Sequence, residues 1–312
     1  MNILIVGTGA LACLFAARLA QAQRTVTMLG AWQEGIDALN RAGVRLVDAQ
    51  NRERRFPVRA VSDPRECAGA TYAIVLVKAW QTERAARQLR DCLAEDGLAL
   101  TLQNGLGNRE TLARDLGTGR VALGSTTTGA TLLGPGLVKA GGEGVVSLEQ
   151  KPALGPLEEA LRSAGFNVQT VENPEALIWG KLVINAAINP LTALLRVKNG
   201  ELLERPSARE AMRALAREAA EAARAEGISL PFDDPIARVE EVAQKTAANI
   251  SSMLQDVLRG APTEIDAICG AVVQTAEKHR LSAPVNWTCW QLVKALEASR
   301  RDEDKGAVLP SS

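Results

Sequence analysis

Histidine, the residue that most often performs general acid–base catalysis near neutral pH, occurs only once in this chain of 312 residues. His279 lies in the run Glu277-Lys278-His279-Arg280, near the end of an expected helix. A histidine there usually acts as a solvated cation that stabilises the helix C-terminus. We therefore expect any chemistry to depend on other residues.

The cysteines give no sign of metal or disulfide chemistry. They are odd in number, and no two of them form a CxxC pair. A zinc site and a disulfide framework are both disfavoured, and no metal site is expected. We interpret the thiols as small buried side chains in a reducing cytosol: Cys13, Cys67, Cys92, Cys269 and Cys289.

An excess of charge and a long apolar run are also missing. Thirty-six basic residues balance thirty-six acidic ones, which gives no support for a nucleic-acid or membrane-surface partner. No segment reaches the roughly 18 uninterrupted apolar residues of a transmembrane helix. Residues 1–22 are apolar, but they lack the positively charged start of a signal peptide and contain Arg18. We expect a cytoplasmic protein.

Short β-branched runs alternate with helical patterns in the first part of the chain. Strands are expected at residues 2–6, 25–29, 73–77, 98–102 and 121–123, and helices at 13–23, 80–93 and 105–116. This alternation predicts right-handed crossovers and a parallel sheet. Glycine-rich residues 126–148 are expected to form one or two hairpins that extend the sheet, followed by a helix at 154–164 and an edge strand at 166–171.

Beyond Asn173-Pro174 only helical patterns follow, at residues 175–195, 208–226, 235–248, 251–258, 264–278 and 285–299. The change predicts an α/β chain of two domains. The first, at 1–172, is a Rossmann-type dinucleotide-binding domain, and the second, at 173–312, is all-helical.

A glycine loop joins the first strand to the first helix, in the pattern Gly7-x-Gly9-x-x-Ala12. The first glycine permits the tight turn, the second lets a pyrophosphate approach the backbone, and the alanine takes the third glycine's place. Free N–H groups at the helix N-terminus then face the phosphates. A plain strand–helix turn is the simpler alternative, although cofactor binding is favoured by the position of the loop.

The residues that would distinguish NAD from NADP are less clear. After the second strand, Gly30-Ala31 offers neither an acid for a ribose 2′-hydroxyl nor an arginine for a 2′-phosphate. Arg41 or Arg45 could reach back to replace that arginine. Lys78 follows the 73–77 strand at the ligand-binding edge of the sheet, where it could face a cofactor phosphate or simply be solvated.

A narrow polar stripe marks the otherwise apolar helix at 175–195. Lys181, Asn185 and Asn189 are four residues apart, so each step moves only ~40° around the helix. Solvated helix faces seldom carry two asparagines, which are poor helix formers. The stripe could bind a ligand or hydrogen-bond to a neighbouring loop. Asn249, Ser252 and Asp256 form a second polar row. Glu264 alone would be read as complementing a helix dipole.

Taken together, these residues resemble the ketopantoate reductase family over nearly the whole chain. The matching stretches are Gly7-Thr8-Gly9-Ala10-Leu11, Lys78-Ala79-Trp80-Gln81, Gln103-Asn104-Gly105-Leu106-Gly107, Lys181-Leu182-Val183-Ile184-Asn185, Ile188-Asn189-Pro190-Leu191-Thr192-Ala193, Asn199-Gly200-Glu201-Leu202, Asn249-Ile250-Ser251-Ser252-Met253-Leu254-Gln255-Asp256 and Thr263-Glu264-Ile265-Asp266.

The resemblance implies the NADPH-dependent reduction of 2-dehydropantoate to (R)-pantoate, with Lys181 as general acid. Asn104 would position the lysine and touch the nicotinamide, and Glu264 would hold hydroxyls of the substrate or the nicotinamide ribose. The resemblance also implies catalytic roles for Lys181, Glu264 and Asn104. It implies substrate contacts by Asn104, Lys181, Asn185, Asn189, Asn199, Asn249 and Ser252, and cofactor contacts by Gly7, Thr8, Gly9, Ala10, Leu11, Ala12, Lys78, Asn104, Ala130 and Glu264.

One departure concerns the cofactor, because family members usually carry an arginine where Gly30-Ala31 stands. NADP(H) is still expected, with NAD(H) possible. Two alternatives remain: a related Rossmann dehydrogenase that acts on another 2-keto acid or an opine, and a dinucleotide-sensing protein without catalysis. A monomer or a homodimer is expected.

Overall fold

The computed structural model describes residues 2–48 and 50–304, so Met1 and residues 305–312, the outer ends of the two expected domains, lie outside it. The chain forms two compact units. The first comprises residues 1–103 and 107–174, and the second comprises Asn104–Leu106 and Glu175–Ser312. The main division therefore falls two residues beyond the expected boundary, and a short segment around Asn104 belongs to the helical unit.

The first unit contains an eight-stranded sheet in the order β12-β11-β8-β7-β6-β1-β2-β5. Six neighbouring strands, from β8 to β5, are parallel; β11 is antiparallel to β8 and parallel to the edge strand β12. The strands are β1 (Ile3–Val6), β2 (Val26–Leu29), β5 (Arg59–Val61), β6 (Ala70–Val75), β7 (Leu93–Thr101), β8 (Val121–Thr126), β11 (Val145–Glu149) and β12 (Asn167–Val171). The predicted parallel sheet is confirmed.

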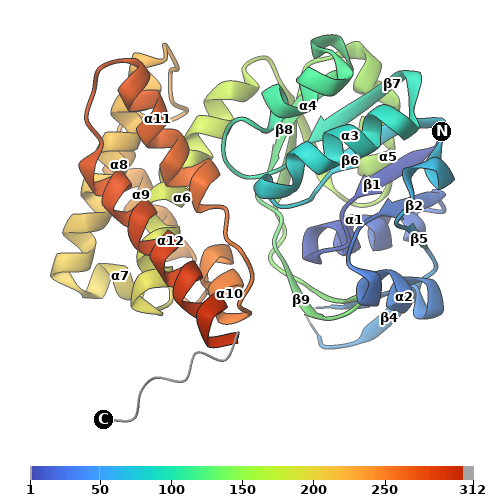
Figure 1. Cartoon of the computed structure of the whole chain (residues 1–312), viewed down its shortest axis with the longest axis horizontal. Helices are drawn as coiled ribbons and strands as arrows, with labels where there is room; N and C mark the ends of the chain where they lie inside the picture. Colours follow the sequence, from blue (N-terminus) through green and yellow to red (C-terminus); the bar gives the residue numbers. More distant parts are fainter. Residues whose placement is uncertain (1, 49, 305–312) are drawn as a thin grey trace. The chain divides into compact units, whose positions relative to one another are not determined.

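Side chains alternate between two buried faces of this sheet. Ile3 and Ile5 of β1 join the core formed with α1 (Ala10–Gln21), α2 (Gln33–Ala42) and α5 (Gly155–Ser163). Leu4 and Val6 join the core formed with α3 (Thr82–Cys92) and α4 (Asn108–Leu116) on the other face (Figure 1). Burial on both faces explains why β1 is a continuous apolar run.

A second, four-stranded sheet in this unit corrects the expectation for residues 126–148. Its order is β4-β3-β10-β9, with β3 (Val44–Val47), β4 (Glu53–Phe56), β9 (Ala130–Gly134) and β10 (Leu137–Ala140). The β9–β10 hairpin therefore does not extend the main sheet, which gains only β11. The strands β3 to β5 were not expected, because the charged, exposed residues of β4 show no apolar alternation; α2 was not expected either.

Two predicted helices begin later than expected. A 3₁₀ turn at Ala79–Gln81 precedes α3. Residues 104–107 form a loop before α4, because Gly105 and Gly107 have φ values of +80° and +83°, outside the helical region. Short 3₁₀ turns also lie at Pro64–Cys67, Thr118–Arg120 and Pro152–Leu154.

In the described part of the second unit every regular element is a helix, as predicted (Figure 1). The helix expected at 264–278 begins instead with a π-helical turn, Asp266–Gly270, and α7 was not expected. Its α-helices are α6 (Pro174–Leu195), α7 (Glu201–Glu204), α8 (Pro206–Ala225), α9 (Pro235–Lys245), α10 (Ser252–Leu258), α11 (Ala271–Lys278) and α12 (Pro284–Asp304).

Helix α6 is the core helix of this unit. By length and composition it could cross a membrane, with a mean hydropathy of 1.3, but 67% of that window is buried inside the protein. Pro190 lies within it and cannot donate the helical hydrogen bond to the Ala186 carbonyl. The thiol of Cys269, in the π-helical turn, donates to that carbonyl over 3.9 Å.

Candidate active site

The amide of Asn104 donates from Nδ2 to Oε2 of Glu264 over 3.0 Å. The following glycine makes this contact possible. A Cβ on Gly105 would lie 2.4 Å from the Ala267 carbonyl oxygen, so only glycine lets the backbone approach so closely. The Leu106 N–H then donates to the same carbonyl over 3.1 Å. The 104–106 segment therefore rests on the π-helical turn that follows Glu264.

Lys181 on α6 is the basic group of this cluster. Burial lowers its pKa from the ordinary 10.5 to about 8, and the Glu264 carboxylate opposes part of that shift. A lysine with such a pKa is mostly protonated at neutral pH, yet it gives up its proton far more readily than a solvated lysine does. The hydrogen bond of Asn104 to Glu264 and the electrostatic effect of Glu264 on Lys181 bring these three residues into one cluster.

The rest of the polar stripe runs toward α10. Asn185 is half-buried and Asn189 is buried. One turn further on, Thr192 Oγ1 lies 2.7 Å from Oγ of Ser251, which accepts from the Leu254 N–H and caps α10. Ser252, the next residue, is exposed at the start of that helix. Thr192 therefore links the stripe to the segment that carries Ser252.

Asn199 is oriented by a residue whose role the sequence does not reveal. Its Nδ2 donates to Oγ1 of Thr246 over 2.9 Å, while its Oδ1 is buried and has no hydrogen-bond partner. The Thr246 hydroxyl donates in turn to the Val242 carbonyl over 2.7 Å. A buried acceptor without a partner is costly unless a ligand or water supplies a donor. The hydrogen bond to Thr246 therefore fixes the Asn199 amide in an orientation that leaves its Oδ1 without a protein donor.

The residues of the second polar row, Asn249, Ser252 and Asp256, differ in exposure. Asn249 is exposed, and its carbonyl accepts from the Asn199 N–H over 3.1 Å. Asp256 is 2% exposed and is ion-paired with Arg259 at 2.8 Å. Asn249 and Ser252 thus remain accessible to a ligand, whereas Asp256 lies in the interior of the helical unit.

In the first unit the glycine loop has the geometry that a pyrophosphate requires. Gly7 has φ +131°, and a Cβ there would lie 3.3 Å from the backbone of Leu76 and Val77. A Cβ on Gly9 would meet no protein atom within 4 Å, and α1 begins at the next residue. Gly9 therefore faces open space at a helix N-terminus, and Ala12 is fully buried against the sheet. The loop fits a bound dinucleotide.

The buried Gln103 hydrogen-bonds to the segment that follows the neighbouring strand β6. Gln103 Nε2 donates to the Val77 carbonyl over 3.0 Å and to Thr82 Oγ1 over 2.8 Å. These bonds position the backbone just before Lys78, which directly precedes the 3₁₀ turn ahead of α3. Ala130 is the first residue of β9, which follows the end of β8 at Thr126.

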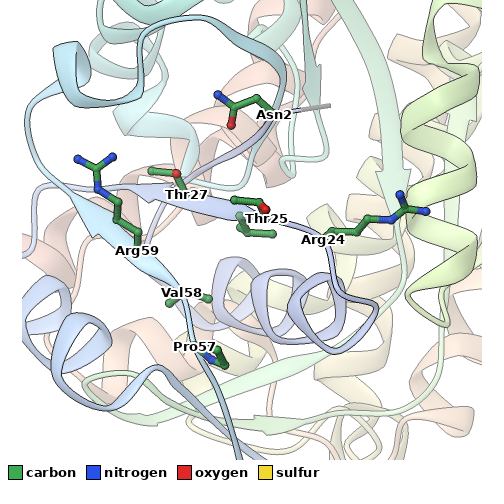
Figure 2. A pocket seen from close by; sticks show the side chains of 8 residues that line it. Asn2, Arg24, Thr25, Thr27, Pro57, Val58 and Arg59 are labelled. Carbon is green, nitrogen blue, oxygen red and sulfur yellow. The ribbon is translucent and has the colours of Figure 1, made fainter.

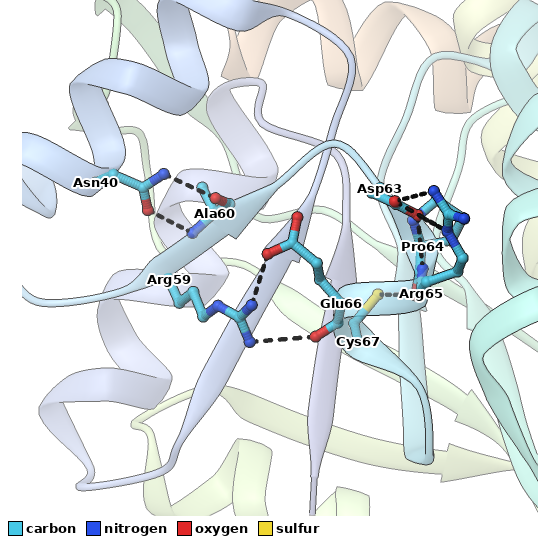
Figure 3. Close-up of polar contacts among 8 residues, drawn as sticks. All are labelled: Asn40, Arg59, Ala60, Asp63, Pro64, Arg65, Glu66 and Cys67. Atoms are coloured by element: carbon cyan, nitrogen blue, oxygen red, sulfur yellow. Dashed lines mark hydrogen bonds and ion pairs between the residues drawn. The ribbon is translucent and has the colours of Figure 1, made fainter.

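A shallow pocket lies at the opposite edge of the sheet, near the starts of β1, β2 and β5 (Figure 2). Its two arginines already have partners. Arg24 donates to Ser163, and Arg59 pairs with Glu66 at 2.8 Å (Figure 3). Ligands of parallel α/β sheets bind at the carboxyl ends of the strands, so this pocket is not the cofactor site.

Comparison with known proteins identifies the family. Residues 3–152 match the model described as Ketopantoate reductase PanE/ApbA, and residues 173–297 match its C-terminal model. A 2-dehydropantoate 2-reductase of Archaeoglobus fulgidus is 37% identical over 303 residues, which cover 95% of this chain and 98% of that protein. The chain belongs to the ketopantoate reductase family.

Solved structures agree with this membership. A PanE/ApbA family ketopantoate reductase from Ralstonia eutropha has a TM-score of 0.90 at 30% identity, with 96% of this chain and all of that one covered. D-mandelate dehydrogenase, solved with NADH and anilino(oxo)acetate, also has a TM-score of 0.90, at 27% identity, covering 96% and 99%. The ketopantoate reductase fold is thus shared with a dehydrogenase whose name specifies a different substrate.

Proposed function

We propose that this chain reduces 2-dehydropantoate to (R)-pantoate with a reduced nicotinamide dinucleotide, the reaction that supplies pantoate for pantothenate and coenzyme A. The observation that carries the proposal is the cluster of Lys181, Glu264 and Asn104. It provides an acid suited to neutral pH in a chain that has one histidine, and the family's curated relatives are 2-dehydropantoate 2-reductases.

The protein's own residues have two tasks in this reaction. The Lys181 ammonium polarises the ketone oxygen and donates a proton to it as the alkoxide forms, and solvent then reprotonates the lysine. Asn104 positions the lysine, and the Glu264 carboxylate holds hydroxyl groups and favours the charged form of Lys181. When bound, the reduced nicotinamide supplies the hydride to the ketone carbon. One hydride and one proton together convert the C=O group to CH–OH.

The remaining polar residues bind the substrate. Its carboxylate and hydroxyl require several donors and acceptors, which the stripe and α10 provide. The unpartnered Oδ1 of Asn199 is suited to accept from the substrate hydroxyl. The substrate contacts in this proposal are Asn104, Lys181, Asn185, Asn189, Asn199, Asn249 and Ser252.

The glycine loop is the proposed binding site for the cofactor pyrophosphate. Gly7 to Ala12 would hold the pyrophosphate, with Lys78 and Ala130 along the remainder of the dinucleotide and Asn104 and Glu264 at the nicotinamide end. In this assignment residues 1–172 supply most of the cofactor contacts and residues 173–312 most of the substrate contacts, with Asn104 and Glu264 as the exceptions. The family implies NADP(H), whereas Gly30-Ala31 leaves NAD(H) open.

The proposal includes a cytoplasmic setting and a monomer or homodimer. All five cysteines are buried free thiols, which suits a reducing compartment. Gel filtration coupled to light scattering measures the oligomeric state directly.

The test is to incubate the purified chain with 2-dehydropantoate and either NADPH or NADH, and to identify the product by chiral chromatography. (R)-pantoate, formed in step with cofactor oxidation, supports the proposal. Turnover of the keto acid that corresponds to mandelate, without turnover of 2-dehydropantoate, would establish the alternative 2-keto acid dehydrogenase. Cofactor binding without any turnover would establish the sensing protein.

A further inference from the structure

The hydroxyl of Thr246 determines which end of the Asn199 amide faces it. Thr246 directly follows α9, and its Oγ1 donates to the Val242 carbonyl four residues earlier, over 2.7 Å. A threonine hydroxyl carries one proton, so this bond leaves Oγ1 only its lone pairs. Its second partner, 2.9 Å away, must therefore be a donor, and the NH2 group is the donor end of the Asn199 amide. The acceptor Oδ1 is then directed away from Thr246.

The reversed amide would make fewer hydrogen bonds. If Oδ1 faced Thr246, the hydroxyl would have to donate to it and release the Val242 carbonyl, so one bond would replace two. A typical hydrogen bond in a protein changes an equilibrium by roughly fivefold. The orientation with NH2 toward Thr246 is favoured by about that factor.

The backbone on both sides of this contact is anchored. The Asn199 N–H donates to the Asn249 carbonyl over 3.1 Å, and the Gly200 N–H donates to the Ala247 carbonyl over 3.2 Å. A Cβ on Gly200 would lie 2.5 Å from the Cβ of Ala247, so glycine permits this close packing. The Asn249 N–H donates to the Thr246 carbonyl over 2.8 Å and closes the turn. Asn199 is therefore held against the turn at 246–249.

The acceptor of Asn199 is left for a bound molecule. Asn199 lies two residues before α7, and an asparagine near a helix start often uses its side-chain oxygen to accept from the first N–H groups. No side chain caps α7 in this way, and Oδ1 of Asn199 is buried without a partner. A buried acceptor needs a donor, which here must come from outside the chain.

Only one group of the proposed substrate can provide that donor. The carboxylate and the ketone of 2-dehydropantoate accept hydrogen bonds but cannot donate them, whereas its hydroxyl can do both. The turn at 246–249 leads into Ser252, and Asn249 lies within it, so the acceptor of Asn199 adjoins two other proposed substrate residues. The substrate hydroxyl is therefore the group that fits Oδ1.

We propose that Thr246 is a specificity-determining residue that acts through Asn199. By fixing the amide, it restricts this position of the site to substrates that present an O–H donor, and it disfavours substrates that present only an acceptor there. Thr246 is thus a positioning residue and does not itself contact the substrate. The inference rests on the proposed function, because the hydroxyl concerned is that of 2-dehydropantoate.

Three keto acids that differ only at this hydroxyl test the inference. 2-Dehydropantoate presents a donor, its methyl ether at that oxygen presents only an acceptor, and the analogue with hydrogen in place of the hydroxyl presents neither. The measurement is kcat/KM for each compound with the same reduced cofactor. We expect the wild type to favour the hydroxyl over the ether by at least tenfold, since the ether leaves Oδ1 unpaired or must turn the amide. A smaller preference would overturn the inference.

Thr246→Val removes the hydroxyl and keeps the shape of the side chain. The amide can then turn its NH2 group toward the ether oxygen, so the preference for hydroxyl over ether should fall at least threefold. The preference for hydroxyl over the hydrogen analogue should stay within about twofold, because either end of the amide pairs with a hydroxyl. A purely structural role would lower all three kcat/KM values together and leave both ratios unchanged. Thr246→Ala replaces this variant if circular dichroism shows that the valine variant is unfolded.

Two control variants separate the hydroxyl from general packing. Thr246→Ser keeps the hydroxyl and should retain both wild-type ratios within about twofold. Thr288 on α12 also donates from Oγ1 to a carbonyl four residues earlier, that of Pro284, over 2.8 Å. Thr288→Val is therefore the matched control, and both ratios should be unchanged in it.

Asn199→Ala checks the group through which Thr246 acts. It should lower the preference for hydroxyl over the hydrogen analogue, and an unchanged preference would show that Oδ1 does not meet the hydroxyl. A hydroxyl-to-ether ratio that falls less than threefold in Thr246→Val, or that falls equally in Thr246→Ser, would overturn the inference and leave the proposed function standing. A wild type that does not reduce 2-dehydropantoate would overturn both.

Discussion

Asn104 and Glu264 are hydrogen-bonded at 3.0 Å although 160 positions separate them in the chain. Asn104 follows the central strand β7, yet it belongs to the helical unit, because the 104–106 segment packs on the π-helical turn at Asp266–Gly270. The contact joins the Asn104 amide to the carboxylate that raises the pKa of Lys181. The following predictions test this arrangement.

Gly105→Ala should disrupt the Asn104–Glu264 contact. The added Cβ would lie 2.4 Å from the Ala267 carbonyl, and φ at this position is +80°. We expect a loss of about 1–3 kcal/mol in the free energy of unfolding and a reduced kcat. Denaturant titration and steady-state kinetics measure both. Gly119→Ala is the matched control, because its Cβ meets no atom within 4 Å. A Gly105→Ala variant as stable and active as the control would contradict this packing argument.

Glu264→Gln should shift the pH dependence of reduction. In the wild type, kcat/KM should fall as pH rises through about 8, because Lys181 must be protonated to act as the acid. The Glu264 carboxylate raises the pKa of Lys181, so its replacement by a neutral amide should move the decline to lower pH. A pH–rate profile of both proteins measures the shift. An unchanged or higher apparent pKa would show that Glu264 does not stabilise the protonated lysine.

Burial of Lys181 should also appear in stability. Below pH 8 the lysine is protonated in the folded and the unfolded chain, and the shift from 10.5 to about 8 costs about 3 kcal/mol. Between these values the unfolded chain binds the proton that the folded chain has lost, so stability rises with pH. The free energy of unfolding of the wild type, minus that of Lys181→Met, should therefore increase across this interval. A constant difference would show that the ammonium is solvated.

Gly9→Val should abolish dinucleotide binding while the fold persists. A side chain at Gly9 meets no protein atom within 4 Å, so it would occupy the space assigned to the pyrophosphate. Circular dichroism checks the fold, and calorimetry with NADPH and NADH checks binding. Unchanged affinity in a folded variant would make this loop a simple turn.

Features with a local signature could be predicted from the sequence. The buried strands, the glycine loop and the Lys181–Asn185–Asn189 stripe follow from apolar runs, from turn residues and from helical spacing. The fold class and the family are confirmed. The roles of individual site residues remain predictions.

Features that depend on distant contacts could not be predicted. The β9–β10 hairpin joins β3 and β4 through pairings that no local pattern specifies. The loop at 104–107 looks helical until its positive-φ glycines are placed against Ala267. The role of Thr246 follows only from its hydrogen bond to Asn199. Each depends on a tertiary contact that overrides the local pattern.

The most direct test of the proposed function is the steady-state kcat/KM for 2-dehydropantoate, measured on the wild type, on Lys181→Ala and on the exposed-lysine control Lys278→Ala. We predict wild-type and control values well above those for the keto acid of mandelate, and a kcat for Lys181→Ala at least ~10²-fold lower. A Lys181→Ala variant that keeps more than about half of the wild-type kcat, or a wild type that does not reduce 2-dehydropantoate, would contradict the account.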